Sequence, residues 1–172
     1  MGRFAEGRIE LLQGDITLQE VEAVVNAANE SLLGGGGVDG AIHRAAGPAL
    51  LEECRSLGGC PTGQCRITGG HHLRARWVIH TVGPVWRGGG KGEEDLLASC
   101  YRHCLELAAD RGISSLAFPS ISTGAYGFPV PKAAEIASGE IGRFLARKAL
   151  PAKIRMVCFD AETLRAYGKA FG

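Results

Sequence analysis

Short apolar runs alternate with longer amphipathic segments along the chain, and this alternation constrains the fold most strongly. Apolar runs bounded by Gly and Pro predict strands, whereas apolar residues that recur every three or four positions predict helices. We expect strands over residues 8–12, 23–25, 64–68, 77–81, 116–118 and 154–159. We expect helices over residues 38–46, 48–57, 93–111, 131–148 and 161–171. Strands separated by helices predict an α/β protein with a three-layer α/β/α sandwich.

The length of the chain favours one domain, which we expect to span residues 1–172. A domain of this size buries about 70% of its unfolded surface, which is enough for a hydrophobic core. Glycine occurs 26 times, roughly twice the average usage. The glycines are clustered rather than periodic, which indicates loops shaped around a ligand.

Charge and hydropathy exclude several classes of partner. Nineteen basic and 18 acidic residues give a formal net charge of +1, so the chain has no strong positive field for long nucleic acids. No apolar run approaches the ~20 residues that span a bilayer, and residues 1–10 are too mixed and polar for a signal peptide. We therefore expect a cytoplasmic protein without a membrane or nucleic-acid partner. Nothing in the sequence suggests an obligate dimer, so we expect a monomer.

The six cysteines do not show the spacing of a zinc site, because no C-x-x-C occurs and no histidine lies at ligand spacing. Cys100 and Cys104 lie four residues apart in the expected helix 93–111, among leucines, which is typical of core residues. We expect free thiols in a reducing compartment and no metal.

Residues 24–47 carry the strongest signal for a ligand. An apolar strand ends near Asn26 and Asn29, the glycines 34–37 follow, and a helix opens with Asp39 in its first turn. Glycine lets a backbone approach a ligand closely, and a helix N-terminus presents unpaired N–H groups with partial positive charge. Together these features predict a phosphate site that needs no Lys or Arg. The carboxylate of Asp39 repels a phosphate, which suggests chemistry rather than affinity alone.

A second loop of small residues, 120–127, also lies between an expected strand and an expected helix. Neither this loop nor the glycines 34–37 match a Walker loop or the dinucleotide fingerprint. Ligands of open α/β sheets bind beyond the carboxyl ends of the strands, where both loops lie. Two facing loops of this kind can hold a diphosphate from both sides.

Other residues at strand ends have both structural and ligand-binding interpretations. Asp15 is suited to cap a helix, and it could also accept a hydrogen bond from the exocyclic amine of a base. Phe159 could belong to the core, but an aromatic ring at a strand end can stack on a base. Of Asn26 and Asn29, we expect one to bond its own loop and the other to face a sugar hydroxyl.

Several polar residues are more simply structural. His43 lies one helical turn after Asp39 on the same face and is expected to be packed. His80, within the expected strand 77–81, should be buried with its hydrogen bonds satisfied. Glu53 is expected on a solvated helix face, and residues 87–92 are expected to form a mobile surface loop.

Five motifs in order resemble the macrodomain family, and among its members the MacroD-type ADP-ribose hydrolases. The motifs are Gly14-Asp15-Ile16-Thr17, Val25-Asn26-Ala27-Ala28-Asn29, Gly34 to Gly40 with Ala41-Ile42-His43, Ile79 to Pro84, and Ile121 to Gly124 with Tyr126-Gly127. The resemblance covers residues 8–171. It implies a mixed, mostly parallel sheet between helices, with ADP-ribose in a cleft at the crest of the sheet.

The resemblance also implies a role for each matching residue. Asp15 and the N–H of Ile16 would bind adenine, Phe159 would stack on it, and Asn26 would brace the loop that follows. The diphosphate would be bound from one side by Gly35, Gly36 and Val38, and from the other by Ser122, Thr123, Gly124, Ala125 and Tyr126. Asn29 would hold the distal ribose, with Asp39 near its anomeric carbon. Phe159 stands where many relatives have Tyr, so only a hydroxyl is lost.

The implied reaction is hydrolysis at the distal ribose, with a water that Asp39 orients or activates as a general base. Substrates would be O-acyl-ADP-ribose, including O-acetyl-ADP-ribose, or proteins that carry mono-ADP-ribose on Asp or Glu, with no cofactor. Attack at the anomeric carbon and attack at the acyl carbonyl both remain open. Three other functions also remain open: a binding module that only reads ADP-ribose, a phosphatase for ADP-ribose 1''-phosphate, and a protein-interaction role.

Overall fold

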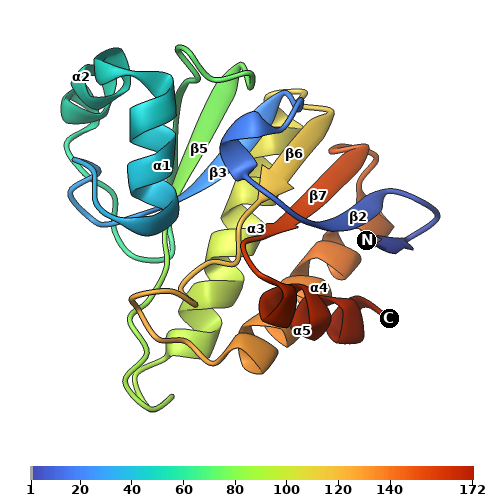
Figure 1. Ribbon diagram of the computed structural model, residues 1–172. Coiled ribbons are helices and arrows are strands. Elements are labelled where there is room, and N and C mark those ends of the chain that lie inside the picture. Colours follow the sequence, from blue (N-terminus) through green and yellow to red (C-terminus); the bar gives the residue numbers. More distant parts are fainter. Residues whose placement is uncertain (1) are drawn as a thin grey trace.

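A computed structural model describes residues 2–172, and one sheet of seven strands organises them (Figure 1). The strand order is β1-β2-β7-β6-β3-β5-β4. Only the edge strands β1 and β4 run antiparallel to their neighbours, so the sheet is mixed and mostly parallel, as the resemblance implies. The strands are β1 (Gly2–Phe4), β2 (Ile9–Gln13), β3 (Ala23–Ala28), β4 (Cys65–Gly69), β5 (Trp77–Val82), β6 (Ser115–Phe118) and β7 (Lys153–Cys158).

Helices cover both faces of this sheet, which confirms the three-layer sandwich (Figure 1). One layer is formed by α1 and α2, and the other by α3, α4 and α5. Their bounds are α1 (Gly37–Ala46), α2 (Pro48–Leu57), α3 (Glu93–Asp110), α4 (Val130–Arg147) and α5 (Ala161–Phe171), and a short 3-10 helix, η1 (Ile16–Leu18), follows β2. Among residues 2–172, no helix is both long and apolar enough to cross a membrane.

The sequence predicts all five helices and six of the seven strands. It misses β1, whose three residues Gly-Arg-Phe show no alternation, and it misses η1. It also ends β3 too early: the strand continues to Ala28, so Asn26 lies within the sheet rather than after it. A polar residue fits in this buried strand because its amide nitrogen is hydrogen-bonded, as described below.

Two hydrophobic clusters hold the layers together, one on each face of the sheet. The larger cluster joins the sheet to α3, α4 and α5, and it includes Cys100 and Cys104 in their expected core positions. The smaller cluster joins the sheet to α1 and α2. All six cysteines are free thiols, and only Cys65 is not fully buried.

The loop over residues 87–92 is more firmly held than expected for a mobile segment. Glu93, which is almost fully buried at the start of α3, accepts hydrogen bonds from the backbone N–H groups of Arg87, Gly89 and Lys91. Burial alone would raise the pKa of this carboxyl, but the backbone donors outweigh it and lower the pKa to about 2. The loop is therefore anchored to α3 by one carboxylate.

Candidate functional site

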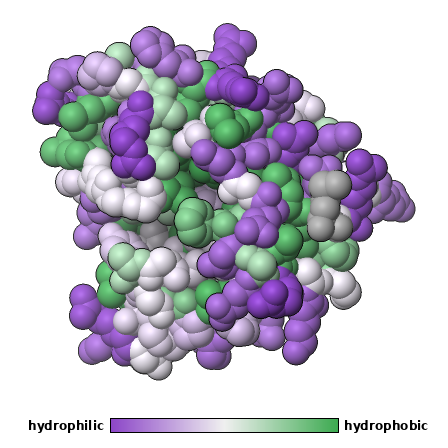
Figure 2. Space-filling view, viewed as in Figure 1, coloured by the Kyte–Doolittle hydropathy of each residue, from purple (hydrophilic) through white to green (hydrophobic). Residues whose placement is uncertain are grey.

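A cleft of about 950 Å³ lies beyond the carboxyl ends of the parallel strands. Residues that follow β2, β6 and β7 line it together with the first turns of α1. Six predicted site residues lie on its wall: Asp15, Ile16, Val38, Thr123, Gly124 and Phe159. In Figure 2 the face seen in Figure 1 is hollowed between its upper and lower parts, with apolar and pale residues in the hollow and hydrophilic ones around it.

Asp15 has the capping role that the sequence allowed, and its second oxygen is left without a partner. It caps η1, because its Oδ1 accepts from the backbone N–H of Thr17 at 2.9 Å and from the Thr17 hydroxyl at 2.7 Å. Its Oδ2 has no hydrogen bond within residues 2–172 and remains free at the edge of the cleft. Gln19 donates to the Asp15 carbonyl at 3.0 Å and accepts from Arg155 at 3.1 Å, which fixes this turn to the sheet.

Phe159 is the most exposed large hydrophobic residue described, with 86% of its surface accessible. It immediately follows β7, and Asp160 after it caps α5 by accepting from the Thr163 N–H at 2.8 Å. Burying an aromatic ring against a flat apolar partner is favourable. A ring left exposed at the rim of a cleft is therefore suited to stack on a planar ligand.

The first glycine loop leads into a helix N-terminus without a side-chain cap. Gly36 caps α1 with its backbone only, and its carbonyl accepts from Gly40 at 3.1 Å. The N–H groups of Gly37, Val38 and Asp39 in the first turn have no partner within residues 2–172. Free donors at the positive end of a helix dipole form a site for an anionic group.

Asp39 lies in this first turn, only 4% exposed, and its two carboxylate oxygens have different surroundings. Its Oδ1 accepts from the Asn26 amide at 2.8 Å and lies 3.4 Å from Nε2 of His43. Its Oδ2 lies on the side of Gly35, where a Cβ would come within 3.0 Å of it. Burial raises the pKa of the Asp39 carboxyl, and the Asn26 hydrogen bond and His43 oppose that rise.

One of the two asparagines bonds its own loop, as the sequence predicts, but it is Asn29 and not Asn26, to which the resemblance gave that role. Asn26 is fully buried and donates to Asp39, so its side chain supports that carboxylate instead of lining the cleft as a ligand residue. Asn29 is the one that braces the loop: its Nδ2 donates to the Gly34 carbonyl at 2.9 Å, and its Oδ1 accepts from Ser31 and Leu32.

Gly35 lies between Asn29 and Asp39. A Cβ at this position would lie 3.5 Å from Nδ2 of Asn29 and 3.0 Å from Oδ2 of Asp39. The structure therefore brings the two predicted catalytic side chains to the same glycine, next to the start of α1. The absence of a side chain at Gly35 keeps the space in front of Asp39 open.

The second loop carries a row of unpartnered backbone donors beside the cleft, which its residues Thr123 and Gly124 line. The N–H groups of residues 122–126 donate to no group within residues 2–172. The Ser122 backbone has a φ of 67°, a left-handed conformation that only some residues adopt. The Ser122 carbonyl accepts from Phe128 at 2.9 Å, and its buried hydroxyl has no partner among the described residues.

Buried tyrosines fix this second loop from behind. Tyr167 on α5 makes a 2.8 Å hydrogen bond with the Ser120 hydroxyl, and Tyr101 on α3 accepts from the Ile121 N–H at 3.4 Å. Burial raises the pKa of Tyr167 to about 12, so its hydroxyl stays protonated. The Tyr126 carbonyl accepts from Trp86 at 2.8 Å. These contacts hold the loop in place before any ligand binds.

Sequence reasoning missed Arg44 on the cleft wall. Val38, Ala41 and Arg44 all line the cleft, and their spacing of three residues places them on one face of α1. The guanidinium of Arg44 reaches back to Gly40, where a Cβ would lie 3.1 Å from Nη1. The helical spacing from Val38 was the available signal for this cation.

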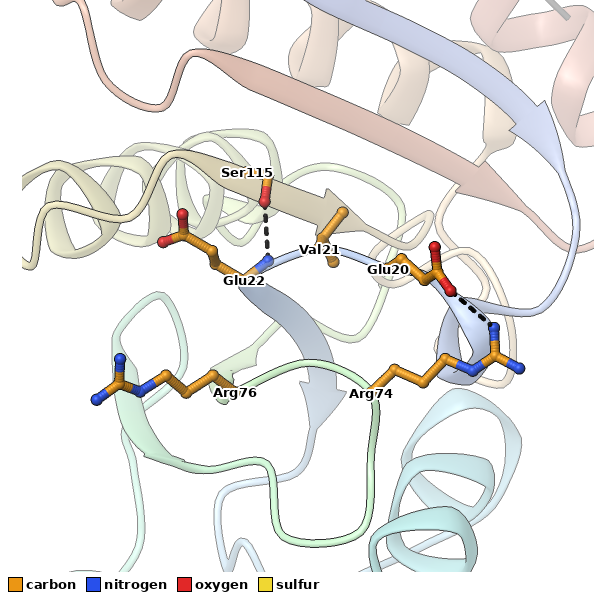
Figure 3. Close-up of a pocket in the computed structure, with 6 residues that line it drawn as sticks. All are labelled: Glu20, Val21, Glu22, Arg74, Arg76 and Ser115. Atoms are coloured by element: carbon orange, nitrogen blue, oxygen red, sulfur yellow. Dashed lines mark hydrogen bonds and ion pairs between the residues drawn. The ribbon is translucent and has the colours of Figure 1, made fainter.

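A second hollow, of about 600 Å³, lies at the opposite ends of the strands and is shown in Figure 3. It is lined by Glu20, Val21, Glu22, Arg74, Arg76 and Ser115. Arg74 pairs with Glu20 at 3.6 Å, while Arg76 points the other way (Figure 3). Its charged groups do not converge on a common point, so the cleft at the carboxyl ends is the better candidate. Within residues 2–172, no group of three or more His, Cys, Asp or Glu is placed to hold a metal ion.

Comparison with known proteins agrees with this geometry. The family model for the macro domain matches residues 25–137. The chain belongs to the macrodomain family. An O-acetyl-ADP-ribose deacetylase of Salmonella newport is 55% identical over 166 residues, which cover 94% of this chain and 93% of that one.

Two solved macrodomains have closely similar structures. The Oceanobacillus iheyensis macrodomain with ADP has a TM-score of 0.91 and 46% identity, covering 94% of this chain and 88% of that one. A Trypanosoma brucei macrodomain in complex with ADP-ribose has a TM-score of 0.90 and 46% identity, covering 96% of this chain and 70% of that one. The cleft of this macrodomain therefore lies in a fold that binds adenosine diphosphates in related proteins.

Proposed function

We propose that this macrodomain binds ADP-ribose and hydrolyses esters at its distal ribose, with O-acetyl-ADP-ribose as substrate. The relative from Salmonella newport, named for this deacetylation, supports the proposal through its 55% identity. The observation that carries it is the buried carboxylate of Asp39 at the start of α1. A site that only binds a diphosphate has no need for a negative charge beside the phosphate donors.

The exposed end of the cleft would bind the adenosine. Oδ2 of Asp15 is free to accept from the adenine amine, and the N–H of Ile16 can donate to a ring nitrogen. Phe159 would stack on the base, an interaction worth about 1–3 kcal/mol per base in related stacking platforms. These contacts position the substrate but do not take part in the reaction.

The diphosphate would lie between the two loops. Gly35, Gly36 and Val38 would donate to it from the N-terminus of α1, and residues 122–126 would donate from the other side. Backbone donors in a rigid loop need no reordering when the anion binds. Binding at both phosphates would hold the distal ribose beside Asn29 and Asp39.

At the distal ribose, Oδ2 of Asp39 would orient a water and accept its proton as the water attacks. Asn29 would hold the ribose hydroxyls, which requires it to exchange part of its present hydrogen bonding within the loop. Attack at the acyl carbonyl breaks the ester bond and releases acetate and ADP-ribose. For an ester on O1'', attack at the anomeric carbon breaks the C1''–O1'' bond instead, and acetate leaves with O1'' to give the same two products. The same chemistry would remove mono-ADP-ribose from Asp or Glu of a modified protein.

Hydrolysis in ¹⁸O water tests the proposal and separates the two routes. We expect O-acetyl-ADP-ribose to be converted to ADP-ribose and acetate. Mass spectrometry would find the label in acetate for acyl attack and unlabelled acetate for anomeric attack on an O1'' ester. If the protein binds ADP-ribose but does not convert the ester, hydrolysis is contradicted. The protein would then be a module that only binds ADP-ribose. Release of phosphate from ADP-ribose 1''-phosphate, with the acetyl ester intact, would indicate the phosphatase instead.

A further inference from the structure

A buried chain of hydrogen bonds runs from Asp39 through the sheet. Asn26 on β3 donates to Oδ1 of Asp39 at 2.8 Å and contacts Nδ1 of His80 on β5 at 3.1 Å. Nε2 of His80 contacts the hydroxyl of Thr68 on β4 at 2.9 Å, and that hydroxyl donates to the Gly69 carbonyl at 3.1 Å. The side chains of Asn26, His80 and Thr68 are at most 1% exposed.

The chemistry of the groups gives this chain one direction. Asn26 uses both hydrogens of the same amide nitrogen, one for the carboxylate and one for the imidazole. Nδ1 of His80 must then be the acceptor, so Nε2 carries the proton and donates to Thr68. The His80 ring is neutral, since burial together with the charge of His43 lowers its pKa to about 3.

The orientation of the Asn26 amide leaves one buried atom without a partner. Its Oδ1 accepts no hydrogen bond within residues 2–172, although the amide is fully buried. An unpaired buried carbonyl is unfavourable, so this orientation needs a compensating gain. The gain is the pair of donations to Asp39 and His80, and the imidazole acceptor fixes which way the amide faces.

We propose that His80 and Thr68 are positioning residues for the reaction at Asp39. They hold the Asn26 amide so that it donates to Oδ1, which leaves Oδ2 directed toward Gly35 and the substrate. The proposal rests on the proposed function, in which Asp39 is the general base. A histidine that only fills the core would satisfy its own nitrogens without affecting a carboxylate on another element.

Paired substitutions separate positioning from folding. Thr68→Val removes the hydroxyl with almost no change in volume, and Thr68→Ser keeps it. His80→Leu removes the acceptor for Asn26, and His80→Asn keeps a polar group near the position of Nδ1. We expect kcat to fall about 10- to 100-fold in Thr68→Val and His80→Leu, as when supporting hydrogen bonds around metal ligands are lost. The two conservative variants should retain most of the activity.

Ligand affinity and the NMR spectrum of His80 distinguish a positioning role from a purely structural one. The Kd for ADP-ribose should stay within about twofold in all four variants, because none of these residues lines the cleft. Imidazole ¹⁵N spectra of the parent protein should show His80 neutral with the proton on Nε2. A proton on Nδ1 would overturn the proposal, because Asn26 could then not donate to it.

Failure of this inference can be told apart from failure of the proposed function. If Asp39→Asn keeps the turnover of the parent, Asp39 is not the general base. The proposed positioning of Asp39 by His80 and Thr68 is then contradicted as well. Loss of turnover in Asp39→Asn, with kcat within twofold of the parent in both Thr68→Val and His80→Leu, would overturn the positioning role alone. If His80→Leu does not fold, the Thr68 pair and the NMR spectrum still decide.

Discussion

The two ends of the site are built in opposite ways. At one end, Asp15 and Phe159 are exposed, on short turns that directly follow β2 and β7. At the other end, Asp39 is buried and connected by hydrogen bonds to Asn26 and, through it, to the centre of the sheet. An exposed ring can bind a base without prior desolvation of charge, whereas a buried carboxylate is held in one orientation before substrate arrives. From this contrast we expect affinity and turnover to depend on different residues.

The largest effect should follow from Asp39→Ala. Loss of a general base reduces kcat by about 10²- to 10⁴-fold, while the Kd for ADP-ribose should change little, because phosphate binding depends on backbone donors. Calorimetric titration with ADP-ribose and a deacetylation assay measure the two quantities. If Asp39→Ala keeps the turnover of the parent, turnover does not depend on the buried end of the site.

The opposite pattern is expected at Phe159. Phe159→Ala should weaken ADP-ribose binding by about 1–3 kcal/mol, which is roughly 5- to 150-fold in Kd, through loss of stacking. At saturating substrate, kcat should stay close to the parent value. Phe159→Tyr keeps the ring and is the matched control. If Ala and Tyr give equal affinities, stacking is not the interaction.

Gly35 tests whether the space in front of Asp39 is required. Gly35→Ala places a methyl group 3.0 Å from Oδ2 of Asp39, and crowding of this kind costs about 1–3 kcal/mol. We expect kcat to fall about tenfold, with a smaller change in Kd. Gly142→Ala, which adds the same group on α4 with nothing within 4 Å, is the control. Full activity of Gly35→Ala would show that water and substrate do not use this space.

Asp15 tests the hydrogen bond to adenine that is proposed for the exposed end of the site. Asp15→Ala should weaken ADP-ribose binding about five- to tenfold, which is about 1–1.4 kcal/mol and within the net range of one typical hydrogen bond. The inosine analogue lacks the exocyclic amine, so the parent should bind it more weakly than ADP-ribose and the variant should bind both alike. Asp15→Asn keeps the cap on Thr17 and controls for the turn. An unchanged preference for ADP-ribose in Asp15→Ala would reject this contact.

A smaller, graded effect is expected from pH. Burial raises the pKa of Asp39, and the proposed base acts only when ionised. The value of kcat/KM should therefore fall as the pH is lowered through this raised pKa, at higher pH than the ~3.9 of an ordinary Asp. A pH–rate profile with its acid limb at or below pH ~4, or no limb at all, would contradict this assignment.

The sequence predicts the layers, most elements and the loops of the site because these depend on local patterns. Apolar periodicity identifies the helices, and the glycines before Val38 mark the start of α1. What the sequence could not give is the partner of each polar side chain. Both Asn26 and Asn29 follow an apolar run, and only the register of β3 with β5 places Asn26 opposite His80.

For His80 the sequence predicts burial but not the hydrogen-bond partners. Its burial follows from the apolar residues around it, and the structure confirms it. Its hydrogen bonds to Asn26 and Thr68 join three different strands, with partners 54 and 12 residues away, so no local pattern could indicate them. Arg44, by contrast, could have been found from its spacing to Val38 along α1.

A crystal structure with ADP-ribose bound tests most directly whether the exposed end of the site binds adenine and the buried end faces the distal ribose. The account predicts adenine on Phe159, the diphosphate between the two glycine-containing loops, and Oδ2 of Asp39 facing C1'' of the distal ribose. Asn26 should still donate to Oδ1 in that complex. A distal ribose directed away from Asp39, or a carboxylate rotated out of the site with ADP-ribose bound, would contradict it.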